Sequence, residues 1–110
     1  MPTPRPGNPV RGSTTGRPIM AAMDLLGRRW ALRVIWELRD GPLGARALLT
    51  RCEGLSSSVL YQRLGELTDA GLLSATVDGY ALTPVGASLG KAIAPLDAWA
   101  NAWAHGHGGS

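Results

Sequence analysis

Hydrogen-bonding side chains gather in the stretch GLSSSVLYQRLGELTDAGLL, which runs from position 54 to position 73. Three hydroxyls and one carboxamide recur there at helical spacing, on Ser57, Ser58, Tyr61 and Gln62. A glutamine carboxamide can pair with the edge of an adenine, and hydroxyl groups can bond to bases or phosphates. The indicated chemistry is therefore hydrogen-bonded recognition of a polar ligand such as a nucleic acid.

Helix signals in the same stretch would position these side chains. Ser56 is suited to be an N-cap, because its hydroxyl can accept from a backbone N–H of the first turn. Leu60, Leu64 and Leu67 follow at i, i+4 and i+7 and predict a buried face. Gly71 can end the helix in the left-handed conformation. The polar side chains then lie on the opposite face, near a helix N-terminus that attracts phosphate. Taken alone, such a face is more often simply solvated.

The remaining elements form a recognisable order. Hydrophobic spacing and Gly/Pro signals predict helices over 18–26, 28–39 and 43–52, strands over 72–77 and 80–82, and a last helix with Thr83 as N-cap and Pro84 at its first position. Asp78-Gly79 favours a type I′ turn, and Pro95 should bend the last helix. The order predicts a mainly α protein with a small β-hairpin, a winged helix-turn-helix. In that architecture the second helix of the pair enters the major groove of DNA.

Charge is distributed unevenly along the 110 residues, whose formal net charge is +3. Residues 1–63 contain ten arginines against four acidic residues, whereas residues 64–110 contain one lysine against four acidic residues. This asymmetry favours a polyanion as partner, although a solvated arginine-rich surface would look the same. The single cysteine, Cys52, excludes an internal disulfide and is expected in the core, with a redox role left open by the neighbouring Arg51.

Length and composition predict one folded domain with flexible ends. We expect a disordered basic arm over 1–17, a folded domain over 18–104 and a flexible tail over 105–110. His105 and His107 are too few ligands for a metal site, so neither a metal nor another cofactor is expected. No apolar run approaches the roughly 20 residues that cross a bilayer, and the first residues do not resemble a secretory signal. The expectation is a cytoplasmic protein with no membrane partner.

The last predicted helix is longer than this small domain needs, and it carries Trp99 and Trp103 four residues apart. Exposed tryptophans on a terminal helix predict a homodimer that places two reading helices ~34 Å apart. Alternatively, both could fold back onto the first helix of the same chain. A planar aromatic effector could bind among Trp30, Trp36, Trp99 and Trp103, although a core without phenylalanine also uses tryptophan for packing.

Five motifs between Arg17 and Trp103 resemble the HxlR branch of winged-helix transcription regulators, close to the MarR group: MDLLGRRWALRVIWEL, DGPLGARALL, GLSSSVLYQRLGELTDAGLL, YALTPVGASL and PLDAWANAW. The resemblance implies a bacterial repressor or activator, usually a homodimer joined through its first and last helices on a roughly palindromic operator. Many members respond to electrophiles, oxidants or small aromatic compounds. The implied dimer contacts are Ile19, Met23, Leu89, Ile93, Leu96, Trp99 and Trp103.

The implied DNA contacts are Ser56, Ser57, Ser58, Tyr61, Gln62, Arg63 and Arg46. Arg63 fits either a phosphate clamp or an internal ion pair. The chain departs from the family pattern at three places. Arg17-Pro18 stands where many members have a thiol-sensing Cys-Pro pair, Gly44-Ala45 replaces an arginine and an aromatic residue, and the wing tip is short and acidic at Asp78-Gly79.

The sequence predicts a sequence-specific DNA-binding regulator, in the first instance a repressor released by a small aromatic ligand. It contains no phosphate-binding loop and no metal-ligand spacing, so an enzyme is not expected. The alternative is a winged-helix module that has lost DNA binding and serves protein interaction or small-molecule sequestration. The acidic wing tip and Gly44 favour that alternative.

Overall fold

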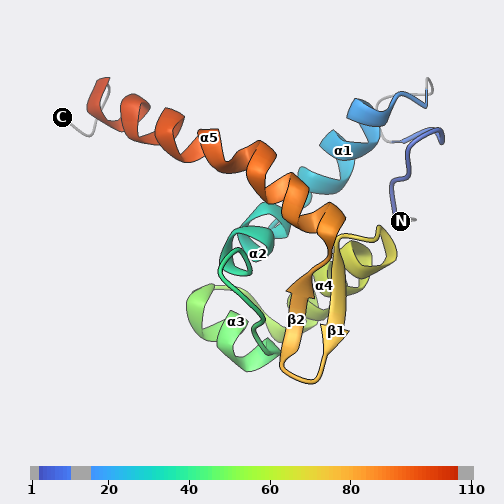
Figure 1. The fold of residues 1–110 in the computed structure, drawn as a ribbon, viewed down its shortest axis with the longest axis vertical. Helices are drawn as coiled ribbons and strands as arrows, with labels where there is room; N and C mark the ends of the chain where they lie inside the picture. Colours follow the sequence, from blue (N-terminus) through green and yellow to red (C-terminus); the bar gives the residue numbers. More distant parts are fainter. Residues whose placement is uncertain (1–2, 11–15, 107–110) are drawn as a thin grey trace.

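Five helices and a two-stranded antiparallel hairpin make up the part of the chain that the computed structural model describes, residues 3–10 and 16–106. The helices are α1 (Pro18–Leu26), α2 (Ala31–Glu37), α3 (Ala45–Arg51), α4 (Ser57–Asp69) and α5 (Pro84–Gly106), and the strands are β1 (Leu73–Thr76) and β2 (Gly79–Leu82). Figure 1 shows α3, α4 and the hairpin at one end of the molecule, with α1 and α5 across the other. This arrangement confirms the predicted winged helix-turn-helix.

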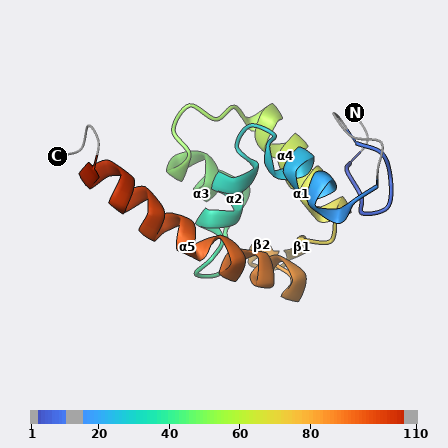
Figure 2. The ribbon, with the colours of Figure 1, turned by 90° about the horizontal axis from the view of Figure 1, so that it is seen from above.

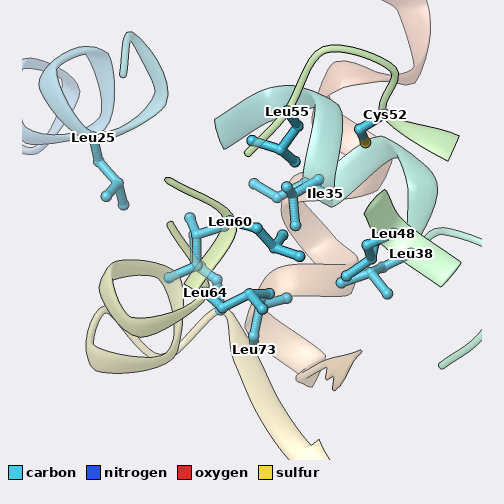
Figure 3. Packing of buried hydrophobic residues seen from close by; sticks show 12 residues of the cluster. Leu25, Ile35, Leu38, Leu48, Cys52, Leu55, Leu60, Leu64 and Leu73 are labelled. Carbon is cyan, nitrogen blue, oxygen red and sulfur yellow. The ribbon is translucent and has the colours of Figure 1, made fainter. Parts of the chain in front are cut away.

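The core lies against the leucine face of α4. Leu60, Leu64 and Leu67 are buried, as their spacing predicts. Each fully buried leucine contributes about 1.5–3 kcal/mol of hydrophobic stabilisation. The other elements complete the cluster (Figure 3). Leu25 comes from α1, Val34 and Ile35 from α2, Leu48 from α3 and Leu73 from β1, while Leu38 and Cys52 directly follow α2 and α3. The packing therefore fixes which face of α4 remains exposed.

Both ends of α4 have the predicted caps. The Ser56 hydroxyl accepts from the Val59 N–H at 3.2 Å, which satisfies one of the unpaired donors of the first turn. At the other end, Gly71 adopts a left-handed backbone with φ +84°, and the Leu72 N–H donates to the Leu67 carbonyl at 2.9 Å. This is a Schellman motif, which ends the helix and turns the chain into β1.

The hairpin loop differs from the predicted type I′ turn. Thr76 pairs with Gly79, so Val77 and Asp78 are the two loop residues rather than Asp78 and Gly79. Neither loop residue has a positive φ, which a type I′ turn requires of both. The predicted turn is therefore wrong in position and in type.

A third segment beside the hairpin explains the role of Gly79. Leu43 forms two backbone hydrogen bonds with Tyr80, at 3.0 and 2.8 Å. The backbone of Leu43 comes so close to Gly79 that an added Cβ would lie 2.5 Å from the Leu43 carbonyl carbon, and Gly79 also has φ +118°. Glycine is thus needed for backbone approach as well as for conformation.

Two helices begin later than predicted. α2 begins at Ala31 rather than at 28, because Trp30 has a left-handed backbone with φ +75° that interrupts the helix. α3 begins at Ala45 rather than at 43, because Leu43 is extended and paired with β2. A distant strand partner overrides the local helical pattern in this second case.

α5 begins as predicted and ends later. The Thr83 hydroxyl accepts from the Gly86 N–H at 3.1 Å and donates to the Gly71 carbonyl at 2.6 Å, so one side chain caps α5 and ties it to the end of α4. The helix continues through Pro95 to Gly106 and includes His105, which corrects the flexible tail predicted from 105; residues 107–110 lie outside the described part. Its C-terminal half projects away from the rest of the chain (Figures 1 and 2).

The N-terminal arm follows the surface of the domain over residues 3–10. Pro4 is buried, the Arg5 guanidinium lies 2.8 Å from the Asp69 carboxylate, and the Gly7 N–H donates to the Gly16 carbonyl at 2.8 Å. The disorder predicted for 1–17 is therefore not what the structure shows for these residues. Residues 1–2 and 11–15 lie outside the described part.

Candidate nucleic-acid interface

The exposed face of α4 carries the hydrogen-bonding side chains that the sequence singled out. All four are exposed, Tyr61 to 56%, while the leucines of the opposite face are buried: Ser57, Ser58, Tyr61 and Gln62. Ser56 is exposed too, but its hydroxyl caps the helix and lies 3.3 Å from the Ser58 hydroxyl. The structure thus gathers five of the seven predicted DNA contacts at the N-terminal half of one helix.

Arg63 points away from this face. Its Nη1 lies 2.9 Å from Glu66 Oε1, its Nε donates to the Arg29 carbonyl at 2.6 Å, and its side chain is only 14% exposed. Of the two roles considered for Arg63, the structure shows the internal ion pair. The phosphate-clamp role stays a prediction, although Nε and Nη1 of the guanidinium already bind inside the protein.

Glu66 holds two arginines at once. Its second oxygen, Oε2, lies 2.7 Å from Arg28 Nη1, and Arg28 also approaches Asp24 at 3.7 Å. The four side chains are each 12–14% exposed. The network therefore joins α1, the turn before α2, and α4 in a partly buried setting where charge-assisted hydrogen bonds are strong. Its long-range link could not be predicted from spacing, since Arg28 and Glu66 are 38 positions apart.

A polar hollow of ≈ 480 Å³ lies beside this network and borders the exposed polar face of α4. Its lining comes from the end of α1, the following turn, and one side of α4: Met23, Asp24, Gly27, Arg28, Arg29, Gln62, Arg63 and Glu66. Gln62 is the member that also belongs to the exposed polar face. The hollow thus continues the candidate interface toward α1.

The other predicted cation and the wing contribute less. Arg46 is exposed in the first turn of α3, and its side chain makes no hydrogen bond or ion pair with the described residues. The wing carries no lysine or arginine between Leu73 and Leu82, and its loop exposes Val77 completely together with Asp78. The positive charge of this region therefore comes from the helices.

Apolar side chains are exposed on α1 and α5. Of the seven predicted dimer contacts, five are about half exposed or more: Ile19 48%, Met23 60%, Leu96 51%, Trp99 59% and Trp103 56%. Leu89 and Ile93 are instead half-buried against their own core. The two tryptophans stack with ring centroids 5.4 Å apart on the projecting half of α5. They do not fold back onto α1 of the same chain.

Within the described part of one chain the four tryptophans do not line a common pocket, and a pocket completed by a second copy stays a prediction. Trp30 packs against the core beside Gly54, and Trp99 and Trp103 lie on α5 beyond the domain. Trp36 alone lines a groove of ≈ 270 Å³ between α2 and α5, formed with Leu32, Arg33, Ile93, Leu96, Asp97 and Ala100. The Arg39 guanidinium covers the Trp36 ring at 3.9 Å from its centroid.

Cys52 packs in the core. Its side chain is inaccessible to solvent, and burial raises the pKa of the thiol, with the charge of Arg33 acting in the opposite direction. A raised pKa leaves little thiolate near neutral pH, and thiolate is the reactive form. Within the described residues no group of three histidine, cysteine or acidic side chains could hold a metal ion, and no helix is long and apolar enough to cross a membrane.

The chain is similar in sequence and in structure to known helix-turn-helix regulators. A family model described as HxlR-like helix-turn-helix matches residues 25–107. The uncharacterized HTH-type transcriptional regulator YvaP of Bacillus subtilis is 28% identical over 89 residues, which cover 74% of this chain and 82% of that protein. Quinone-bound YodB of B. subtilis superposes with a TM-score of 0.70 and 31% identity, covering 76% of this chain and 94% of YodB. A possible HxlR family transcriptional factor from Thermoplasma volcanium superposes with a TM-score of 0.69 and is 25% identical in sequence. The match covers 78% of this chain and 84% of that one.

Glu66 offers a direct test of the network. Replacing it by glutamine leaves Arg28 and Arg63 close together without the carboxylate, so we expect Glu66→Gln to lower the free energy of unfolding by about 1–3 kcal/mol in urea titrations. Glu53→Gln is the matched control, because Glu53 is exposed and has no partner among the described residues. Equal stability of the two variants would contradict a structural role for the network.

Proposed function

The chain belongs to the HxlR-like helix-turn-helix family and is a transcriptional regulator; from this premise we propose that it binds a pseudo-palindromic operator as a homodimer, with α4 in the major groove. Membership in a family of DNA-binding regulators also agrees with the expectation that the chain is not an enzyme. In the proposed complex the exposed polar residues of α4 face the bases, and repression follows when the bound dimer blocks transcription.

The two-sided character of α4 carries the proposal. The leucine face is fixed in the core, so the serines, Tyr61 and Gln62 cannot turn inward. Gln62 is suited to a bidentate pair with adenine, whereas the serine and tyrosine hydroxyls suit phosphates or base edges. The wing exposes Asp78 and has no cation, so we assign it little of the affinity.

A homodimer accounts for the exposed apolar residues of α1 and α5. The stacked Trp99 and Trp103 form an exposed apolar surface near the C-terminal end of α5. Large exposed aromatic side chains of this kind are typical anchors of protein interfaces. Joining two copies there would set two α4 helices at the spacing of one DNA turn, ~34 Å.

We assign the effector to the groove beside Trp36. Leu32, Ile93 and Leu96 give the groove apolar walls beside Trp36, and Arg33 and Asp97 supply charge. A planar aromatic compound suits such a site. The similar protein YodB has been solved with a quinone bound, which supports a planar ring compound as ligand here. Because α5 forms one wall and also the proposed dimer surface, binding would alter the dimer geometry.

Gln62 tests the reading of DNA. Selection of duplexes from a random pool should return a two-fold symmetric site for the wild-type protein. For Gln62→Ala, we expect loss of preference at one base pair of each half-site, corresponding to ~1–3 kcal/mol. Thr68→Ala is the control, because Thr68 is exposed near the other end of α4. An unchanged selected site and affinity for Gln62→Ala would refute the assignment, and failure to select any duplex would favour a module that no longer binds DNA.

The dimer predicts a concentration-dependent mass in sedimentation experiments. We expect a dimer at micromolar concentration and a monomer for the double variant Trp99→Ala, Trp103→Ala, because interface tryptophans often contribute about 2 kcal/mol or more each. Tyr61→Ala, which removes an equally exposed aromatic side chain from α4, should leave the dimer intact. A wild-type monomer at micromolar concentration would be incompatible with the proposal.

The Trp36 groove predicts saturable binding of single-ring aromatic compounds. Calorimetric titration with hydroquinone, catechol and benzoate should give heat for at least one of them, and Trp36→Leu should abolish it by removing the stacking surface. Trp103→Leu serves as control, since Trp103 lies outside the groove. Binding that survives Trp36→Leu would place the effector elsewhere, and no heat across such compounds would argue against an aromatic effector.

A further inference from the structure

The polar hollow between α1 and α4 contains an arginine that the internal network does not use. Arg28 and Arg63 are bound to Glu66, and Arg28 also approaches Asp24. Arg29 directly follows Arg28 in the sequence and lines the same hollow. Its side chain is exposed and makes no ion pair or hydrogen bond with the described residues. Three guanidinium groups thus face two carboxylates, and the excess positive charge belongs to Arg29.

The backbone of Arg29 is held in place. Its carbonyl accepts from Arg63 Nε at 2.6 Å, which anchors it to α4. The next residue, Trp30, has φ +75°, a conformation that L side chains rarely adopt and that persists only when surrounding contacts enforce it. Packing of the Trp30 ring against the core supplies such contacts. Arg29 therefore extends from a turn with a fixed position beside the reading helix.

Gln62 lies where the hollow meets the face of α4 that we place against DNA. It lines the hollow and also belongs to the exposed face of α4 that we place against the bases. Phosphates border the major groove on both sides, so a phosphate must lie near the protein surface that flanks a helix inserted in the groove. The side of α4 that bears Gln62 is flanked by the turn that contains Arg29.

We propose that Arg29 binds a phosphate of the DNA backbone in this hollow, beside the bases that α4 reads. Guanidinium groups suit phosphate because two parallel N–H donors match two phosphate oxygens. Glu66 and Asp24 do not repel the phosphate strongly, because Arg28 and Arg63 neutralise them at short range. Arg63, for which a phosphate clamp was one of two expected roles, already binds Glu66 and the Arg29 carbonyl through two of its nitrogens. This inference rests on the proposed DNA binding.

Salt-dependent binding to a fluorescein-labelled random-sequence 30-base-pair duplex tests the contact without knowledge of the operator. Each phosphate contact contributes about 0.9 to the slope of log Kobs against log salt. We expect Arg29→Gln to lower the magnitude of the slope by about 0.9 per bound protomer. Affinity per protomer should be about eightfold weaker at 0.1 M salt, with the difference from wild type vanishing toward 1 M.

Lys91→Gln is the matched control, since it removes one exposed positive charge from α5, away from the hollow. It should keep the wild-type slope. Thermal unfolding of Arg29→Gln followed by circular dichroism should match the wild type, because the side chain it removes is exposed and unpaired within the described residues. Arg29→Lys should restore most of the slope as a point charge.

The outcomes separate the two proposals. If the wild-type protein binds the duplex with a steep salt slope and Arg29→Gln matches it, the phosphate contact is overturned while DNA binding stands. If Arg29→Gln and Lys91→Gln lower the slope equally, only net charge matters and the site is likewise overturned. If the wild-type protein does not bind duplex even at low salt, the proposed function itself fails.

Discussion

Glu66 links α4, the helix that we propose reads DNA, to the rest of the domain through two arginines. Its two oxygens bind Arg28 and Arg63 at 2.7 and 2.9 Å, and Arg63 in turn donates to the carbonyl of Arg29. A partly buried ionic network of this kind does not guarantee greater stability than an apolar contact, because desolvation offsets much of the attraction. It does demand one geometry. It adds a second constraint to the packed leucine face, because it connects α4 to the turn before α2 and to the end of α1.

The same arrangement connects the two ends of the molecule. α1 joins the network through Asp24 and exposes Ile19 and Met23, while α5 is tied to the end of α4 by the Thr83 hydroxyl and projects its tryptophans outward. The proposed dimer surface and the proposed reading face are therefore attached to the same helix, one near each end. A change in dimer geometry caused by a ligand beside Trp36 would reach α4 through rigid contacts rather than through a flexible linker. If the contacts that join α1 and α5 to α4 had two alternative arrangements, ligand binding could regulate DNA binding by favouring one of them.

Local rules in the sequence predicted most of what surrounds α4. Ser56 as N-cap, the three leucines, Gly71 as terminator, and Thr83 before Pro84 each depend on side chains within a few residues, and each was confirmed. The errors occurred where a distant partner decides the conformation. Leu43 looked helical but pairs with Tyr80, and Trp30 takes a left-handed backbone that its own type disfavours. Arg63 could not be assigned from spacing, because the Arg29 carbonyl that it binds lies 34 positions away.

Directed cleavage of DNA from α4 tests the central claim most directly. Cys52 is buried, so in Tyr61→Cys the new exposed thiol can carry an iron chelate that cleaves nearby sugars. The duplex would be one selected from a random pool by the wild-type protein. The account predicts two clusters of cuts, one in each half-site, about one helical turn apart and related by the two-fold axis of the site. Cleavage in a single cluster, or cuts spread evenly along the duplex, would contradict a dimer that reads DNA through α4.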